Sequence, residues 1–301
     1  MTTMNMIPPR SILAAVDFSE PSRVALQFAT RLARQCGAPL HVLHAEDPLL
    51  AAAAKTSGVD LSRETREELA RFVESVAMPG ATPVHYHVVI GGGTTAICHL
   101  AHREQMDVIV MGMHGMSGPA RAMFGSTTEG VLRQADASVL VVPDTWIPPR
   151  PNSPDLSGTG PVVAAIESVE PALVSAAAAC RLASLLGTSV DLIHIVPELP
   201  VIERWRSHAE AAVARRIEEA RHEFTSILPI LGATVPMELH VESGAVAEGI
   251  AKAVLPTAGR QPILVLGRRT RASRLGAPGA TAYRVLTLTR VPVLVYLAEA
   301  T

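Results

Sequence analysis

DVIVMGMHGMSGPARAMFGSTTEGVLRQADASVLVVP, residues 107–143, is the stretch that decides the fold. It predicts a buried strand, a glycine-rich loop, a helix and a second buried strand. Short, continuous apolar runs at Val108–Met111 and Val139–Val142 are typical of parallel strands that are covered on both faces. Val131 and Leu132 predict the inward face of the helix between them. The stretch therefore indicates an α/β fold built on a parallel sheet.

The loop between these strands contains glycines at 112, 115 and 125, followed by Ser126 and Thr127 at the expected helix start. Gly112 would let a ligand approach the backbone, and Gly115 is free to adopt positive φ. Free N–H groups at a helix start favour a bound anion, and ligands usually bind at the carboxyl ends of parallel strands. The alternative is that the glycines only shape a tight loop and Ser126 is an N-cap.

A carboxylate follows the first expected strand, Ile12–Val16, at the same edge of the sheet. Asp17 is either a hydrogen-bond acceptor for a ligand or a cap for the next helix, a role that Ser19 could also fill. Apolar residues at four-residue spacing from Val24 onward predict that helix, and Gly37 is expected to end it.

Histidines occur on two further expected strands, Leu40–Ala45 and Val84–Ile90. His41 and His44 are three residues apart, which places them on opposite faces of a strand. His85 and His87 are two apart and share a face. Such a pair could ligate a metal, but the sequence shows no third ligand nearby, and a solvated edge-strand face is the preferred interpretation. We therefore predict no metal-ligating residue.

The second half of the chain repeats the first, which indicates a duplication. At an offset of 150 residues (167 − 17 = 150), the matching pairs are Asp17 and Glu167, Gly37 and Gly187, and His44 and His194. A shared HV-x-x-G sequence places Gly244 against Gly91. The strands at Val162–Ile166, Ile263–Gly267 and Val293–Val295 repeat those of the first half.

The second loop departs from the glycine pattern. Gly267 matches Gly112, but Thr270 replaces the second glycine and Ala280 the third, while Thr281 keeps a hydroxyl. We expect a degenerate and mainly structural second site, because a Cβ penalises positive φ and the longer Glu167 would extend into the ligand's space. Four arginines crowd this loop, and they either hold another anion or form a solvated basic face: Arg268, Arg269, Arg271 and Arg274.

Length and composition set limits on the class of protein. The 301 residues suffice for two domains, and the net charge of −2 without a basic block argues against nucleic acid as a main partner. Three widely spaced cysteines match no zinc pattern. The chain start lacks the apolar core of a signal peptide, and no apolar run is long enough to span a membrane. We expect a cytoplasmic protein with no membrane partner.

Proline, serine and glycine dominate residues 144–161, without periodicity. This composition predicts an extended, exposed connector. The predicted organisation is a domain at 1–145, a linker at 146–160 and a second, degenerate domain at 161–301.

The spacing Gly112-x2-Gly115-x9-Gly125-Ser126, together with the run AVDFSEPS around Asp17, resembles the ATP-binding subfamily of the universal stress proteins. The repeat extends the resemblance over nearly the whole chain. It implies a tandem protein with two doubly wound, five-stranded parallel sheets of Rossmann-like type. In that family the last strands pair across a dimer, so we expect an intrachain pseudo-dimer in which Ser138–Val142 and Val293–Tyr296 are antiparallel, and possibly a homodimer.

The resemblance implies a site for an adenine nucleotide, with ATP and Mg²⁺ as cofactors, in the first half only. The residues that it assigns to nucleotide binding are Ala15, Val16, Asp17, Ala45, Met111, Gly112, His114, Gly115, Gly125, Ser126 and Thr127. We expect a regulatory, stress-response protein rather than an enzyme. The alternatives are a slow ATPase or autophosphorylating protein, and an interaction scaffold with a relic site. Walker A and G-x-S-x-G motifs are absent from the sequence.

Overall fold

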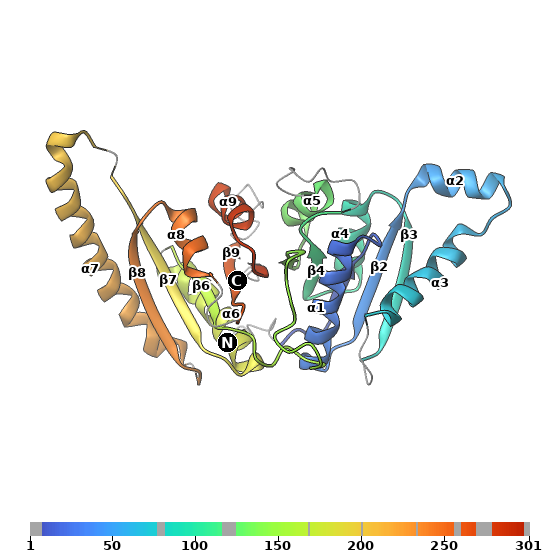
Figure 1. The fold of residues 1–301 in the computed structure, drawn as a ribbon, viewed down its shortest axis with the longest axis horizontal. Helices are drawn as coiled ribbons and strands as arrows, with labels where there is room; N and C mark the ends of the chain where they lie inside the picture. Colours follow the sequence, from blue (N-terminus) through green and yellow to red (C-terminus); the bar gives the residue numbers. More distant parts are fainter. Residues whose placement is uncertain are drawn as a thin grey trace. The chain divides into compact units, whose positions relative to one another are not determined.

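The computed structural model describes residues 8–76, 82–115, 125–167, 169–199, 201–232, 234–255, 260–268 and 279–297, with only the backbone described at 169–172 and 268. The described residues form two compact units, the first ending at Ser157 and the second beginning at Gly158. Figure 1 shows helices packed along the sheet of each unit.

The first unit alternates strands and helices. Its elements are β1 (Ile12–Ala15), α1 (Glu20–Cys36), β2 (Leu40–Glu46), α2 (Pro48–Thr56), α3 (Leu61–Glu74), β3 (Val84–Ile90), α4 (Gly93–Arg103), β4 (Val108–Gly112), α5 (Ser126–Gln134) and β5 (Ser138–Val142). The strands lie in the order β3-β2-β1-β4-β5, and neighbouring strands are parallel. The chain therefore crosses over the sheet between strands, as a doubly wound fold requires.

The second unit repeats this architecture. Its elements are β6 (Val162–Ala165), α6 (Val169–Leu186), β7 (Val190–Pro197), the short 3-10 helix η1 (Glu203–Trp205), α7 (Arg206–Leu231), β8 (Met237–Gly244), α8 (Val246–Ala253), β9 (Ile263–Arg268), α9 (Ala280–Leu288) and β10 (Val293–Leu297). The order is β10-β9-β6-β7-β8, again parallel. The predicted α/β class, with five parallel strands in each unit, is confirmed. The pseudo-dimer arrangement stays a prediction.

Apolar patterning explains these elements. Every residue of β4 and β5 is buried, as their continuous apolar runs predict. The inward positions Val131 and Leu132 are fully buried on α5. Gly37 and Gly187 both end their helices at φ +65°. Gly91 follows β3 at φ +154°, and Gly244 is the last residue of β8 at φ +153°. The predicted equivalence of these glycines is confirmed, and it reflects the same backbone turns in both units.

The predicted exposed connector is wrong in part, because buried residues lie along it. Trp146 is only 6% exposed, and its ring lies 5.0 Å from that of Phe28 in α1. The guanidinium of Arg31 donates to the carbonyl oxygen of Pro151 at 3.4 Å, and Leu156 is fully buried. The segment after β5 therefore packs as part of the first unit.

Among the helices that the structure describes, none combines the length and the apolar character that crossing a bilayer requires.

Candidate functional site

The carboxyl ends of β1 and β4 bring three predicted site residues into contact. A Cβ on Gly115 would lie 2.5 Å from Oδ2 of Asp17, and a Cβ on Gly125 would lie 3.5 Å from the backbone nitrogen of Gly115. The N–H of Gly125 donates to the carbonyl oxygen of Met113 at 3.0 Å, which ties the start of α5 to the end of β4. Asp17, the loop and the helix start thus meet at one edge of the sheet.

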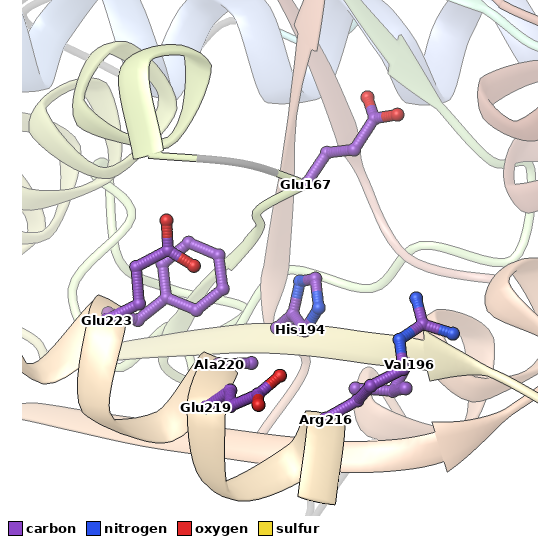
Figure 2. Close-up of a pocket in the computed structure, with 8 residues that line it drawn as sticks. Glu167, His194, Val196, Arg216, Glu219, Ala220 and Glu223 are labelled. Carbon is purple, nitrogen blue, oxygen red and sulfur yellow. The ribbon is translucent and has the colours of Figure 1, made fainter. Parts of the chain in front are cut away.

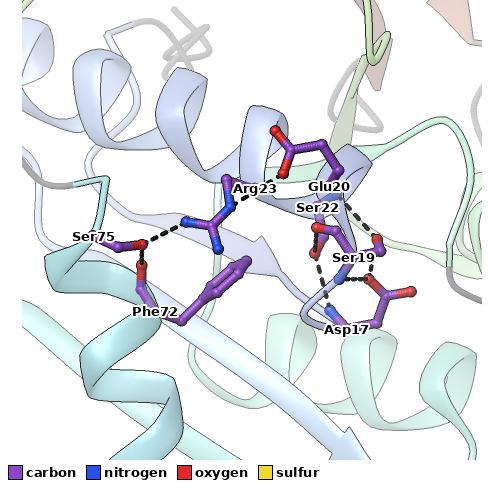
Figure 3. Close-up of polar contacts among 7 residues, drawn as sticks. All are labelled: Asp17, Ser19, Glu20, Ser22, Arg23, Phe72 and Ser75. Carbon is purple, nitrogen blue, oxygen red and sulfur yellow. Dashed lines mark hydrogen bonds and ion pairs between the residues drawn. The ribbon is translucent and has the colours of Figure 1, made fainter.

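Asp17 also organises the start of α1 (Figure 3). Its Oδ1 accepts hydrogen bonds from the N–H of Ser19 at 3.1 Å and from the hydroxyl of Ser19 at 2.5 Å. Ser19 is the N-cap of α1 and accepts from the N–H of Ser22 at 3.3 Å. The cap is therefore Ser19, and Asp17 holds that cap with one carboxylate oxygen while the other faces Gly115.

Different physical reasons explain why glycine occurs at each of the three loop positions. The prediction of positive φ at Gly115 is wrong, because that residue is outside the positive-φ region; a Cβ there would press on Oδ2 of Asp17, so that carboxylate would have to shift. A Cβ on Gly112 would lie 3.0 Å from the backbone of Pro21, so α1 and not a ligand takes that space. A Cβ on Gly125 would make only ordinary van der Waals contacts, with the backbone of His114 and Gly115, so this position tolerates a side chain.

Helix α5 begins without a side-chain cap. Its N-cap is Gly125, so the alternative that Ser126 is the cap is wrong; Ser126 is the first helical residue and is exposed. Among the described residues, none accepts a hydrogen bond from the N–H of Ser126 or Thr127. These donors and the helix dipole favour an anion. Thr128, which the sequence analysis did not single out, is buried and donates its hydroxyl to the carbonyl oxygen of Gly112 at 2.9 Å.

The other predicted residues line the same strand ends. The N–H of Val16 donates to the carbonyl oxygen of Leu43 at 2.9 Å, so that group is already used inside the sheet. Ala45 lies beyond Leu43, the last residue of β2 that pairs with β1. Met111 is buried and pairs with Val141 of β5, so only its backbone is near the edge. The remaining two, Ala15 and His114, are half-buried.

An aromatic side chain that the sequence analysis left out packs beside Asp17. Phe18 has φ +65°, a conformation that is costly for a residue with a bulky side chain. Its ring lies 4.5 Å from that of His44 and 5.4 Å from that of Phe72. Nδ1 of His44 donates to the carbonyl oxygen of Val16 at 2.9 Å. Strained backbone at a site edge persists only where packing holds it in place, and these rings supply that packing.

A buried carboxylate also lies at the end of β2. Glu46 is 2% exposed; its Oε2 accepts from the hydroxyl of Ser62 at 2.9 Å, whereas Oε1 has no hydrogen-bond partner among the described residues. A buried carboxylate oxygen without a donor is costly unless another polar group reaches it.

In the second unit, the match of Ala280 to Gly125 is wrong. Helix α9 has Gly279 as its N-cap, in the position that Gly125 has in α5. The offset is 154 (279 − 125 = 154), and it also pairs the buried residues Val285 and Leu286 with Val131 and Leu132. The glycine cap is retained, whereas Ala280 and Ala282 replace the hydroxyl residues Ser126 and Thr128. Thr270 and Arg269, Arg271 and Arg274 lie outside the described residues.

A polar pocket of about 250 Å³ lies at the corresponding edge of the second unit (Figure 2). Its lining residues are Glu167, His194, Val196, Arg216, Glu219, Ala220, Glu223 and Phe224. His194 repeats His44, because its Nδ1 donates to the carbonyl oxygen of Ile166 at 2.9 Å and its ring lies 4.8 Å from that of Phe224. The position that matches Phe18 is a serine at 168, outside the described residues. The sequence thus supplies no third ring there, and the space is lined by carboxylates.

Comparisons with known proteins agree with this architecture. Residues 9–143 match the model of the universal stress protein family. A universal stress protein of Methanocaldococcus jannaschii is 28% identical over 138 residues, which cover 44% of this chain and 81% of the relative. A functionally unknown Pseudomonas aeruginosa PAO1 protein has a TM-score of 0.63 at 21% identity, covering 98% of this chain and 94% of that one. A universal stress protein from Archaeoglobus fulgidus also has a TM-score of 0.63, at 18% identity, covering 96% and 98%.

The two-unit α/β fold and the glycine-bordered strand edge define a Rossmann-like protein of tandem construction. Residues 9–143, in the first unit, are similar to the universal stress protein family. The second unit, residues 158 onward, shares the sheet topology of the first.

Proposed function

We propose that the first unit binds an adenine nucleotide, ATP with Mg²⁺, and that the protein acts as a cytoplasmic regulator of the stress response rather than as an enzyme. The observation that carries this proposal is the meeting of Asp17, Gly115 and Gly125 beside the uncapped start of α5. It supplies a carboxylate and free backbone donors side by side, which suits a ligand with hydroxyl groups at one end and phosphates at the other.

The chemistry of the donors fits such a ligand. The free N–H groups of Ser126 and Thr127 would hold phosphate oxygens, as uncapped helix starts do. The Asp17 carboxylate would accept from a ribose hydroxyl, and the backbone at Ala45 lies at the strand end where the base would sit. Mg²⁺ would neutralise phosphate charge, and the exposed hydroxyl of Ser126 is available beside it, whereas that of Thr128 is used by Gly112.

The second unit is proposed to bind no nucleotide. Its pocket is lined by three carboxylates, those of Glu167, Glu219 and Glu223, against one guanidinium, that of Arg216. A lining with net negative charge repels phosphates at short range. Ala280 and Ala282 also remove two of the three hydroxyls that α5 has in its first turn, whereas Thr281 keeps that of Thr127.

The sharpest test compares two glycines with the same structural role. Gly125 has φ −66° and ψ 141°, and Gly279 has φ −63° and ψ 163°, so both tolerate a side chain. The Cβ of Gly125→Val would face His114 and Gly115, inside the proposed site. Calorimetric titration of the parent with ATP and Mg²⁺ should give one nucleotide per chain. The Gly125→Val variant should bind at least tenfold more weakly, a loss of about 1.4 kcal/mol. Its melting temperature should fall no further than that of Gly279→Val, because both changes replace an N-cap glycine.

Gly279→Val is the matched control and should bind like the parent. Two equivalent sites per chain, or a loss confined to Gly279→Val, would refute the proposal. Turnover of ATP should stay below about 1 per second, the low end for enzymes.

A further inference from the structure

The outer strands of the second unit bring together three side chains of the types that ligate metals. Asp191 lies on β7 and pairs in register with Glu238 on β8, and His240 follows two residues later on the same face of β8. One ligand atom from each of the three lies within 4.8 Å of the others. Among the described histidines, cysteines and acidic residues, this group of three meets that criterion and no other does.

The electrostatics of this group favour a cation. Burial raises the pKa of the Asp191 carboxyl, the nearby Glu238 raises it further, and His240 lowers it. No described residue donates a hydrogen bond to the Asp191 carboxylate. Nε2 of His240 lies 3.7 Å from Oε2 of Glu238. Asp191 is half-buried, whereas Glu238 and His240 are exposed, and the two carboxylates leave negative charge that a divalent ion would offset.

The first unit provides an internal comparison for the same three positions. The register pairs His41 with His85 just as it pairs Asp191 with Glu238, and His87 corresponds to His240. Nδ1 of His41 lies 2.9 Å from Nε2 of His87, so one ring donates to the other. The rings of these two histidines are stacked 10° from parallel at 5.1 Å. Side chains at these positions therefore do approach one another, and in the first unit two of them satisfy each other without an ion.

We propose that Asp191, Glu238 and His240 form a binding site for one divalent transition-metal ion on the outer strand pair of the second unit. Two oxygens and one imidazole nitrogen are donors that suit Zn²⁺, Co²⁺ or Mn²⁺. Zn²⁺ bonds of about 2.0–2.2 Å need ligand atoms closer than they now lie. Glu238 and His240 can supply that movement, because their side chains are 76% and 45% exposed. Water would fill the remaining coordination positions.

The test uses the full chain, free of nucleotide and of any histidine tag. Calorimetric titration with Zn²⁺ should give one ion per chain, and Co²⁺ should give a visible absorption band that Zn²⁺ displaces. Asp191→Asn and His240→Gln should each weaken Zn²⁺ binding at least tenfold and reduce the Co²⁺ band. Both positions are near the surface of an outer strand pair, so melting temperatures should change little, and that measurement separates lost ligation from lost folding.

The matched control is His41→Gln, at the position in the first unit that corresponds to Asp191. It should leave Zn²⁺ affinity and stoichiometry unchanged. The proposal is overturned if the parent shows no Zn²⁺ binding at micromolar concentration. It is also overturned if Asp191→Asn and His240→Gln bind like the parent, or if His41→Gln is the variant that loses the ion. Because the site is in the second unit and needs no nucleotide, its failure is distinguishable from failure of the proposed ATP site.

Discussion

The two units share one strand order but differ at the edge where the carboxyl ends of their strands lie. In the first unit, Phe18 packs against His44 and Phe72 beside Asp17. In the second unit, His194 and Phe224 are in direct contact and border a pocket lined by carboxylates. A duplicated sheet thus keeps its core while residues at the strand ends change. The core is held by apolar burial in both units, whereas each strand end carries its own polar chemistry.

The largest expected effect is on stability, and it comes from removing the aromatic packing that distinguishes the first unit. Phe18→Ala should lower the free energy of unfolding by about 2–3 kcal/mol, less than for a fully buried phenylalanine because Phe18 is half-buried. Phe18→Gly should be about 1 kcal/mol more stable than Phe18→Ala, because only glycine adopts the native φ of +65° without strain. Denaturant unfolding of both variants measures this. A glycine variant less stable than the alanine variant would show that the backbone strain is unimportant.

A smaller effect concerns the hydroxyl that joins α5 to β4. Thr128→Val keeps the shape of the side chain but leaves the carbonyl oxygen of Gly112 without the donor that Thr128 supplies. The expected loss is about 1–2 kcal/mol of unfolding free energy. The reverse change in the second unit, Ala282→Thr, should cost no more than about 0.5 kcal/mol, the helix-propensity difference. Equal losses in the two variants would mean that the hydrogen bond contributes nothing specific to the first unit.

A third prediction concerns affinity rather than stability. Ser126→Ala removes one exposed hydroxyl but keeps the backbone N–H groups at the start of α5. Nucleotide affinity should fall by about 1–1.5 kcal/mol, the contribution of one hydrogen bond, and the melting temperature should not change. Ala280→Ser, at the matching position of α9, should create no new site. Titration calorimetry of both variants measures the difference. A gain of nucleotide binding in Ala280→Ser would mean that one hydroxyl accounts for the difference in nucleotide binding between the two units.

Much of the fold is predictable from local patterns. Continuous apolar runs predict β4 and β5, and Gly37 and Gly187 end helices where expected, because these signals depend on neighbours in the chain. The sequence misplaces the start of α9 by one residue, because Ala280 matches Gly125 at the offset of 155 that pairs Gly267 with Gly112 (267 − 112 = 155), whereas the offset at Gly279 is 154. Trp146 was assigned to an exposed linker because a single aromatic residue has no periodicity that would reveal its contact with Phe28.

The candidate site was predicted in part. The sequence identified Asp17, Gly115 and Gly125, which the structure brings together, but it gave the wrong reason for Gly115. The collision of a Cβ with Asp17 depends on tertiary packing. The same limit applies to the histidines: His85 and His87 were predicted to share a face, but the register that brings His41 beside them is a property of strand pairing. Register between strands is not encoded in the spacing within one strand.

The smallest expected effect is on the pH dependence of stability, and it comes from the cluster of His41, His85 and His87. This cluster gives a further way to distinguish the two units. Burial, followed by the positive charge of His87 and His85, lowers the pKa of His41. Burial also lowers the pKa of His87, with further lowering by Arg103, His85 and Arg66 against the opposite effect of Glu104. In the unfolded chain these rings would titrate near the ordinary value of about 6.5.

The sign of the pH effect follows from proton binding. As the pH falls below about 6.5, the histidine rings bind protons in the unfolded state but remain neutral in the native state. The free energy of unfolding therefore decreases until the pH reaches the lowered native pKa. Acid should therefore lower the melting temperature, by little because both rings are only half-buried. His87→Gln should lose less stability than the parent between pH 7.5 and pH 5.5. His222→Gln, on the exposed surface of α7, should keep the acid sensitivity of the parent. An equal loss in the parent and in His87→Gln would show that the histidine cluster does not make the first unit acid-sensitive.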